Sequence, residues 1–77
     1  MTIARTEQEW AEWAARYLKV ELKRAEITYE ELAERLQAHG FEETKASIAN
    51  KLARATLSAN FFLASLAVVG HTQVAFD

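Results

Sequence analysis

The chain has 77 residues, of which 51% are hydrophobic, and a formal net charge of −2 at pH 7. This length suits one small domain, residues 1–77, which can bury only a limited fraction of its surface, so a second copy is a reasonable expectation. The absence of cysteine excludes disulfides and thiolate metal sites.

The charges are unevenly distributed along the chain. Residues 1–43 hold six cations and ten carboxylates, a balance of −4, whereas residues 44–77 hold three cations and Asp77, a balance of +2. The acidic total is unlike that of most nucleic-acid-binding domains, but the distribution of charge matters more than its sum. The basic half contains the helix to which we assign a binding face below.

A membrane protein is not expected. The N-terminus has no apolar signal segment, and the longest apolar run, residues 59–69, is short and interrupted by Asn60 and Ser65. We therefore expect a soluble, cytoplasmic protein with no membrane partner.

A first helix is predicted over residues 7–25, with Thr6 as a possible N-cap. Glu21 falls near the middle of its apolar face, where an unpaired charge would be costly. Either Lys51 pairs with Glu21, or the helix rotates slightly and Glu21 lies in water at the rim. The apolar face of this helix recurs at three- and four-residue steps and comprises Trp10, Trp13, Ala14, Tyr17, Leu18 and Leu22.

A second helix begins with a capping box, in which Thr28 and Glu31 satisfy each other's amides. Its apolar stripe predicts a helix that ends at Gly40, a residue suited to the left-handed conformation. Phe41 is expected to anchor a tight turn. The stripe consists of Tyr29, Leu32, Ala33 and Leu36.

A third helix is predicted from about Thr44, with Ile48, Leu52 and Ala55 facing inward and the end before the turn at residues 56–58. A wheel of 100° per residue then turns a small, acid-free face outward. The outward residues are Ala46, Ser47, Asn50, Ala53 and Arg54.

A fourth helix is predicted from the N-cap Ser58 to Val69, closed by Gly70. It has no charge and is apolar on all sides, and such a helix is normally covered on all sides. We assign Phe62, Leu63, Leu66 and Val69 to its inward face.

The opposite face of this helix and the tail, residues 72–76, are assigned to a homodimer interface. The tail alternates like a short strand, which would seek an edge in a second subunit. In the alternative, the aromatics of the first helix wrap both sides of the fourth within one monomer. The assigned interface residues are Phe61, Ala64, Val68, Val74 and Phe76.

Two resemblances support this arrangement. Residues 27–36, ITYEELAERL, resemble the first helix of the helix-turn-helix in lambda-repressor-like and Cro-like regulators. The stretch from Trp10 to Val74 looks more like a family of small bacterial domains of unknown function, on residues 21–36, residues 45–63 and Gly70. The resemblance implies an all-α, four-helix, lambda-repressor-like helix-turn-helix domain with a short C-terminal tail.

Catalysis has little support in the sequence. The chain has no phosphate-binding glycine loop, no HExxH motif and no serine with a convincing histidine and acid partner. His39 and His71 are isolated, and the glutamates at 30–43 suit solvation rather than calcium binding. We therefore expect no enzyme activity, no cofactor, no metal and no small-molecule substrate.

The outward face of the third helix favours duplex DNA as the partner. Asn50 and Arg54 suit adenine and guanine edges, and we assign base contacts to them and to Ser47. Phosphate contacts are assigned to Lys45 and Lys51 on the flanks, and to Thr28 and Tyr29 at a helix start.

The predicted function is a small homodimeric transcriptional regulator. The polar residues on the outward face of the third helix could equally be ordinary solvent-exposed side chains with no ligand. The alternative function is a protein-interaction or oligomerisation module, adaptor or antitoxin-like, that does not bind DNA.

Overall fold

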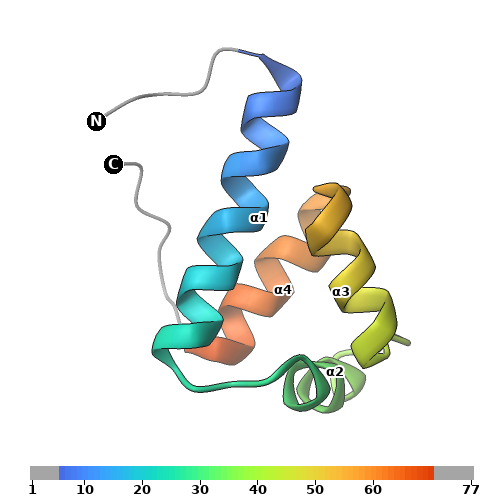
Figure 1. Cartoon of the computed structure of the whole chain (residues 1–77). Helices are drawn as coiled ribbons and strands as arrows, with labels where there is room; N and C mark the ends of the chain where they lie inside the picture. Colours follow the sequence, from blue (N-terminus) through green and yellow to red (C-terminus); the bar gives the residue numbers. More distant parts are fainter. Residues whose placement is uncertain (1–5, 71–77) are drawn as a thin grey trace.

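The computed structural model describes residues 6–70, which form four helices and no strand, so the all-α expectation is confirmed (Figure 1). The predicted tail strand and His71 lie outside the described residues. The helices are α1, Glu7–Arg24; α2, Tyr29–Gln37; α3, Lys45–Arg54; and α4, Ala59–Val69.

Each helix starts at a hydroxyl side chain that caps its first amides. The Thr28 hydroxyl accepts the Glu31 amide at 3.1 Å, and the Glu31 carboxylate accepts the Thr28 amide at 3.3 Å. This is the predicted capping box, and it satisfies amides that no carbonyl within the helix can reach. Thr6, Thr44 and Ser58 are the other N-caps.

All four helices end through residues in left-handed backbone conformations, and Gly70, with φ of 108°, closes α4 as predicted. Gly40, with φ of 85°, follows α2 as predicted, and the Phe41 amide donates to the Leu36 carbonyl at 3.2 Å. The corresponding residues after α1 and α3 are not glycines: Glu26 has φ of 58° and Ala55 has φ of 56°. For a residue with a Cβ this conformation costs about 1–2 kcal/mol.

One residue from each helix meets in the core. Leu18, Leu32 and Ile48 are fully buried, and Phe61 is 1% exposed. α4 packs against α1 and α2, and α3 packs against α1 and α2. In Figure 1, α2 is seen nearly end-on below α3, and α1 lies on the opposite side of the molecule from α3.

The connection between α2 and α3 is longer than expected. Residues 38–44 separate the two helices, whereas a helix-turn-helix usually has a turn of three or four residues. The segment contains the Gly40 closure and the half-buried Phe41, which packs against the core. The expected tight turn is therefore replaced by a seven-residue segment.

The predicted orientation of α4 is wrong for two residues. Phe61, assigned to the dimer interface, is buried within the monomer, and Leu63, assigned inward, is 58% exposed. The reason is that a helix apolar on every side gives no periodic signal that fixes its rotation. Ala64 and Val68 are half-buried against the core, and Val74 and Phe76 lie outside the described residues.

Among the described helices, none is individually long and apolar enough to cross a membrane. α3 and α4 meet the length and composition test only as a pair, and that pair is bent by 117°.

The left-handed residue Ala55 gives a first prediction. Ala55→Gly is expected to raise the free energy of unfolding by about 0.5–1 kcal/mol. Glycine relieves the backbone strain, and the greater conformational entropy of glycine in the unfolded chain offsets part of this stabilisation. Gly40→Ala is expected to lower it by about 1–2 kcal/mol through backbone strain alone, since a Cβ there would meet nothing within 4 Å. Urea unfolding followed by circular dichroism measures both changes.

Ala53→Gly, at an exposed position inside α3, is the matched control and should lower stability by about 1 kcal/mol. If Ala55→Gly also lowered stability, the strain assigned to the end of α3 would be refuted.

Candidate nucleic-acid interface on the third helix

α3 presents an exposed face that agrees with the predicted one. Ile48 is fully buried and Leu52 is 2% exposed, so these two residues fix the rotation of the helix. Asn50 and Arg54 then lie one turn apart at the centre of the exposed side. Lys45 is also exposed, as are the small residues Ala46, Ala49 and Ala53.

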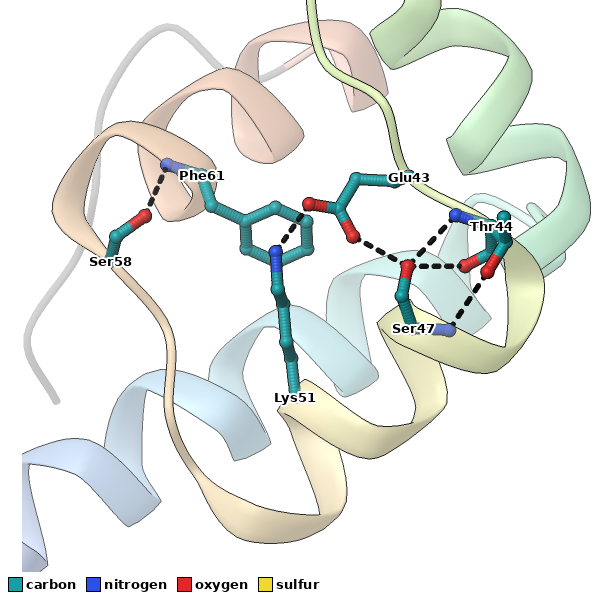
Figure 2. A network of polar contacts seen from close by, with 6 residues as sticks. All are labelled: Glu43, Thr44, Ser47, Lys51, Ser58 and Phe61. Carbon is teal, nitrogen blue, oxygen red and sulfur yellow. Dashed lines mark hydrogen bonds and ion pairs between the residues drawn. The ribbon is translucent and has the colours of Figure 1, made fainter.

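Ser47 is part of the start of α3. Its hydroxyl accepts the Thr44 amide at 2.8 Å and donates to the Glu43 carboxylate at 2.7 Å. The Ser47 amide donates to the Thr44 hydroxyl at 3.1 Å, which completes a capping box (Figure 2). Ser47 is half-buried and its hydroxyl is already hydrogen-bonded at the start of α3, so the hydroxyl is less available to a ligand.

Lys51 points back along α3 to Glu43. Its ammonium group forms an ion pair with the Glu43 carboxylate, and it also lies 4.7 Å from the centre of the Phe61 ring (Figure 2). The Glu43 side chain is only 8% exposed, against 34% for Lys51. The cation therefore neutralises a nearly buried carboxylate and covers an aromatic face of the core.

Of the two alternatives given for Glu21, the pair with Lys51 is wrong, and the Glu21 side chain is 12% exposed rather than in open water. Glu21 instead lies 3.5 Å from Arg24, one turn later in α1. Lys51 pairs with Glu43 because Glu43 lies in the segment just before α3, within reach of the lysine side chain. The prediction failed because it considered acids on the first helix and not the acid in the preceding turn.

The start of α2 offers less to a phosphate than the sequence suggested. Thr28 is exposed, but its hydroxyl holds the Glu31 amide, and the Glu31 carboxylate holds the Thr28 amide. Tyr29 is half-buried against the core. Glu30 and Glu31 place two negative charges in this first turn.

An acidic cleft of 480 Å³ lies between α2 and the start of α3. Its walls include apolar surface from Ala33 and Phe41, and Lys45 at its edge. The sequence places these acids in one solvated cluster, but it does not predict a cleft, because the acids that line it come from two separate segments. They are Glu30, Glu34, Glu42 and Glu43. These carboxylates would repel a nucleic-acid backbone from the cleft itself, so at the start of α3 only Lys45, at the edge of the cleft, offers a cation to a phosphate.

No cluster of metal-binding side chains occurs among residues 6–70, where His39 is exposed in the turn after α2.

Comparison with known proteins gives one match. The sequence model of the family described as "Domain of unknown function (DUF6471)" matches residues 10–74. No curated protein and no solved structure matches the chain. The match covers all four helices apart from the first residues of α1.

The ion pair of Lys51 gives a second prediction. Lys51→Met is expected to lower the free energy of unfolding by about 2–3 kcal/mol, because it leaves the Glu43 carboxylate largely buried without its cation. Glu43→Gln is expected to cost only about 1 kcal/mol, since Lys51 can turn into water. Chemical unfolding of both single variants and the double variant should give a coupling of about 1 kcal/mol or more.

Arg24→Met removes a cation that is 75% exposed, against 34% for Lys51, and serves as the control, with an expected change of about 1 kcal/mol or less. A Lys51→Met variant as stable as Arg24→Met would contradict the structural role assigned to Lys51.

Proposed function

The chain belongs to the family described as a domain of unknown function (DUF6471), and we propose that this member binds duplex DNA sequence-specifically through α3. The observation that carries the proposal is the exposed, acid-free face of α3, with Asn50 and Arg54 one turn apart among alanines. Small neighbours allow a helix to approach the floor of the major groove. An amide and a guanidinium can then pair with adenine and guanine edges.

In this proposal α2 and α3 form a lambda-repressor-like helix-turn-helix unit, and the protein acts as a small cytoplasmic transcriptional regulator. The acidic cleft disfavours contact with α2 and favours contact through the exposed face of α3, with Lys45 at the edge of the cleft. A homodimer would double the contact area with DNA, and one copy alone would bind DNA weakly.

The contacts divide by side chain. Asn50 and Arg54 read bases, and Lys45 contacts a phosphate and sets the register. Ser47 and Lys51 contribute less to DNA than their positions on the wheel implied, because Glu43 already holds both side chains. Thr28 and Tyr29 are left with a marginal phosphate contact next to Glu30 and Glu31.

A second candidate function is a module that holds another protein and does not bind DNA. It is favoured by three large apolar side chains that are exposed in the described part of the chain. They are Trp10, at 41%, Val20, at 41%, and Leu63, at 58%. The slightly acidic total charge also suits this role better than DNA binding.

The proposal predicts salt-dependent DNA binding that depends on the face of α3. Fluorescence anisotropy with labelled genomic duplex fragments at two salt concentrations should show affinity that falls steeply as salt rises. Asn50→Ala and Arg54→Ala should each lower the affinity for the preferred fragments by about tenfold. They should also reduce the preference for these fragments over other sequences. Lys45→Ala should lower the affinity for all fragments by a similar factor. It should also make the slope of log affinity against log salt concentration shallower by about one.

Two exposed residues on other helices provide matched controls. Asn60→Ala on α4 and Lys19→Ala on α1 should leave the affinity within about twofold. No binding at low salt by the folded wild-type protein would reject the DNA proposal and leave the protein-interaction module.

A further inference from the structure

α1 carries two apolar rows. One row, with Ala15, Leu18 and Leu22, is at most 3% exposed and faces the core. The other consists of Trp10, Trp13, Tyr17 and Val20, at successive steps of three, four and three residues. These steps are the spacing of the a and d positions of a heptad, which forms a narrow seam between two helices. We call this second row the aromatic seam.

The aromatic seam is only partly covered by its own domain. Trp10 contacts Trp13 with ring centres 6.3 Å apart, and Trp13 contacts Tyr17 at 4.9 Å. On α4, Phe62 meets Tyr17 at 6.2 Å. Trp10 and Val20, at the two ends of the seam, are each 41% exposed. In Figure 1 the first half of α1 extends beyond the other helices.

The charges of α1 indicate which helix would cover this seam. Its first turn carries Glu7 and Glu9, and its last turn carries Lys23 and Arg24. A second α1 in antiparallel orientation would place Glu7 beside Lys23 of the partner subunit, whereas Glu9 would face Glu21 of the partner subunit, whose carboxylate already pairs with Arg24 within its own helix. The antiparallel orientation would also oppose the two helix dipoles. A parallel second copy would instead bring like charges together.

We propose that the aromatic seam is the homodimer interface, formed by two α1 helices packed antiparallel about a twofold axis near residue 15. In this register Trp10 lies opposite Val20 of the partner subunit, and Trp13 lies opposite Tyr17 of the partner subunit. The large ring at one end of the seam meets the smaller side chain from the other end. The homodimer belongs to the function proposed above, but this interface is tested without DNA.

The two tryptophans of the chain both lie in the seam and report directly on it. On dilution, sedimentation velocity should show the mass falling from dimer to monomer. Tryptophan emission should shift to longer wavelength over the same concentration range, because the Trp10 ring enters water. A mass that is monomeric at every concentration, or an emission that stays constant while the dimer dissociates, would overturn the proposal.

Two exposed apolar residues allow a matched pair of variants. Val20→Glu places a charge in the seam and should raise the dimer dissociation constant by about a hundredfold, since a symmetric dimer carries the change twice. Leu63→Glu, on the outward side of α4, should leave the dissociation constant within about threefold. Both should keep the wild-type circular dichroism because both sites are exposed in the monomer. Loss of the dimer in Leu63→Glu alone would place the interface on α4.

Single cysteines in this cysteine-free chain determine the direction of packing. In the antiparallel register two copies of residue 16 are offset by about 3 Å along the helix axes and two copies of residue 20 by about 15 Å, and the axes themselves are separated by about 8–10 Å. Arg16→Cys should therefore be joined into a dimer by a short bifunctional maleimide with a reach of about 10 Å, and Val20→Cys should form neither this crosslink nor a disulfide in air, since a disulfide needs Cα atoms within about 7 Å. The reverse result would overturn the antiparallel arrangement.

Discussion

The structure depends on burial that no helix can achieve alone. α2, α3 and α4 have 9, 10 and 11 residues, and helices of this length are marginal in water without tertiary packing. Leu32, Ile48 and Phe61 therefore stabilise their own helices chiefly by meeting each other and Leu18 in one core. The Arg35 guanidinium adds a hydrogen bond of 3.0 Å to the Val68 carbonyl, which ties α2 to the last turn of α4.

Local signals in the sequence predicted much of this fold because they act within a few residues. Thr28 and Gly40 marked the two ends of α2, and the spacing of Ile48 and Leu52 turned Asn50 and Arg54 outward. Signals that need tertiary information failed. Because α4 is apolar on every side, its rotation could not be predicted from the sequence. Phe61 was predicted at the surface but is buried, and Leu63 was predicted in the core but is exposed. The partner of Lys51 also depended on where the turn placed Glu43.

The candidate surfaces differ in how their charges are used. On α3, Lys51 is drawn towards the core by Glu43 and Phe61, whereas Lys45 and Arg54 remain exposed. The nominal positive charge of the helix is thus larger than the charge that it offers to a ligand. On α1, the first turn carries two acids, the last turn carries two bases, and an apolar row lies between these turns. Because the two surfaces belong to different helices, dimer formation and ligand binding can be measured independently.

The position of α4 in the chain has a consequence for biosynthesis. This helix packs against α1 and α2 and contributes Phe61 and Leu66 to the core, yet it is the last of the four to be translated. Until residues 59–69 leave the ribosome, the apolar residues of the first three helices lack their cover. The domain should therefore fold in one late, cooperative step.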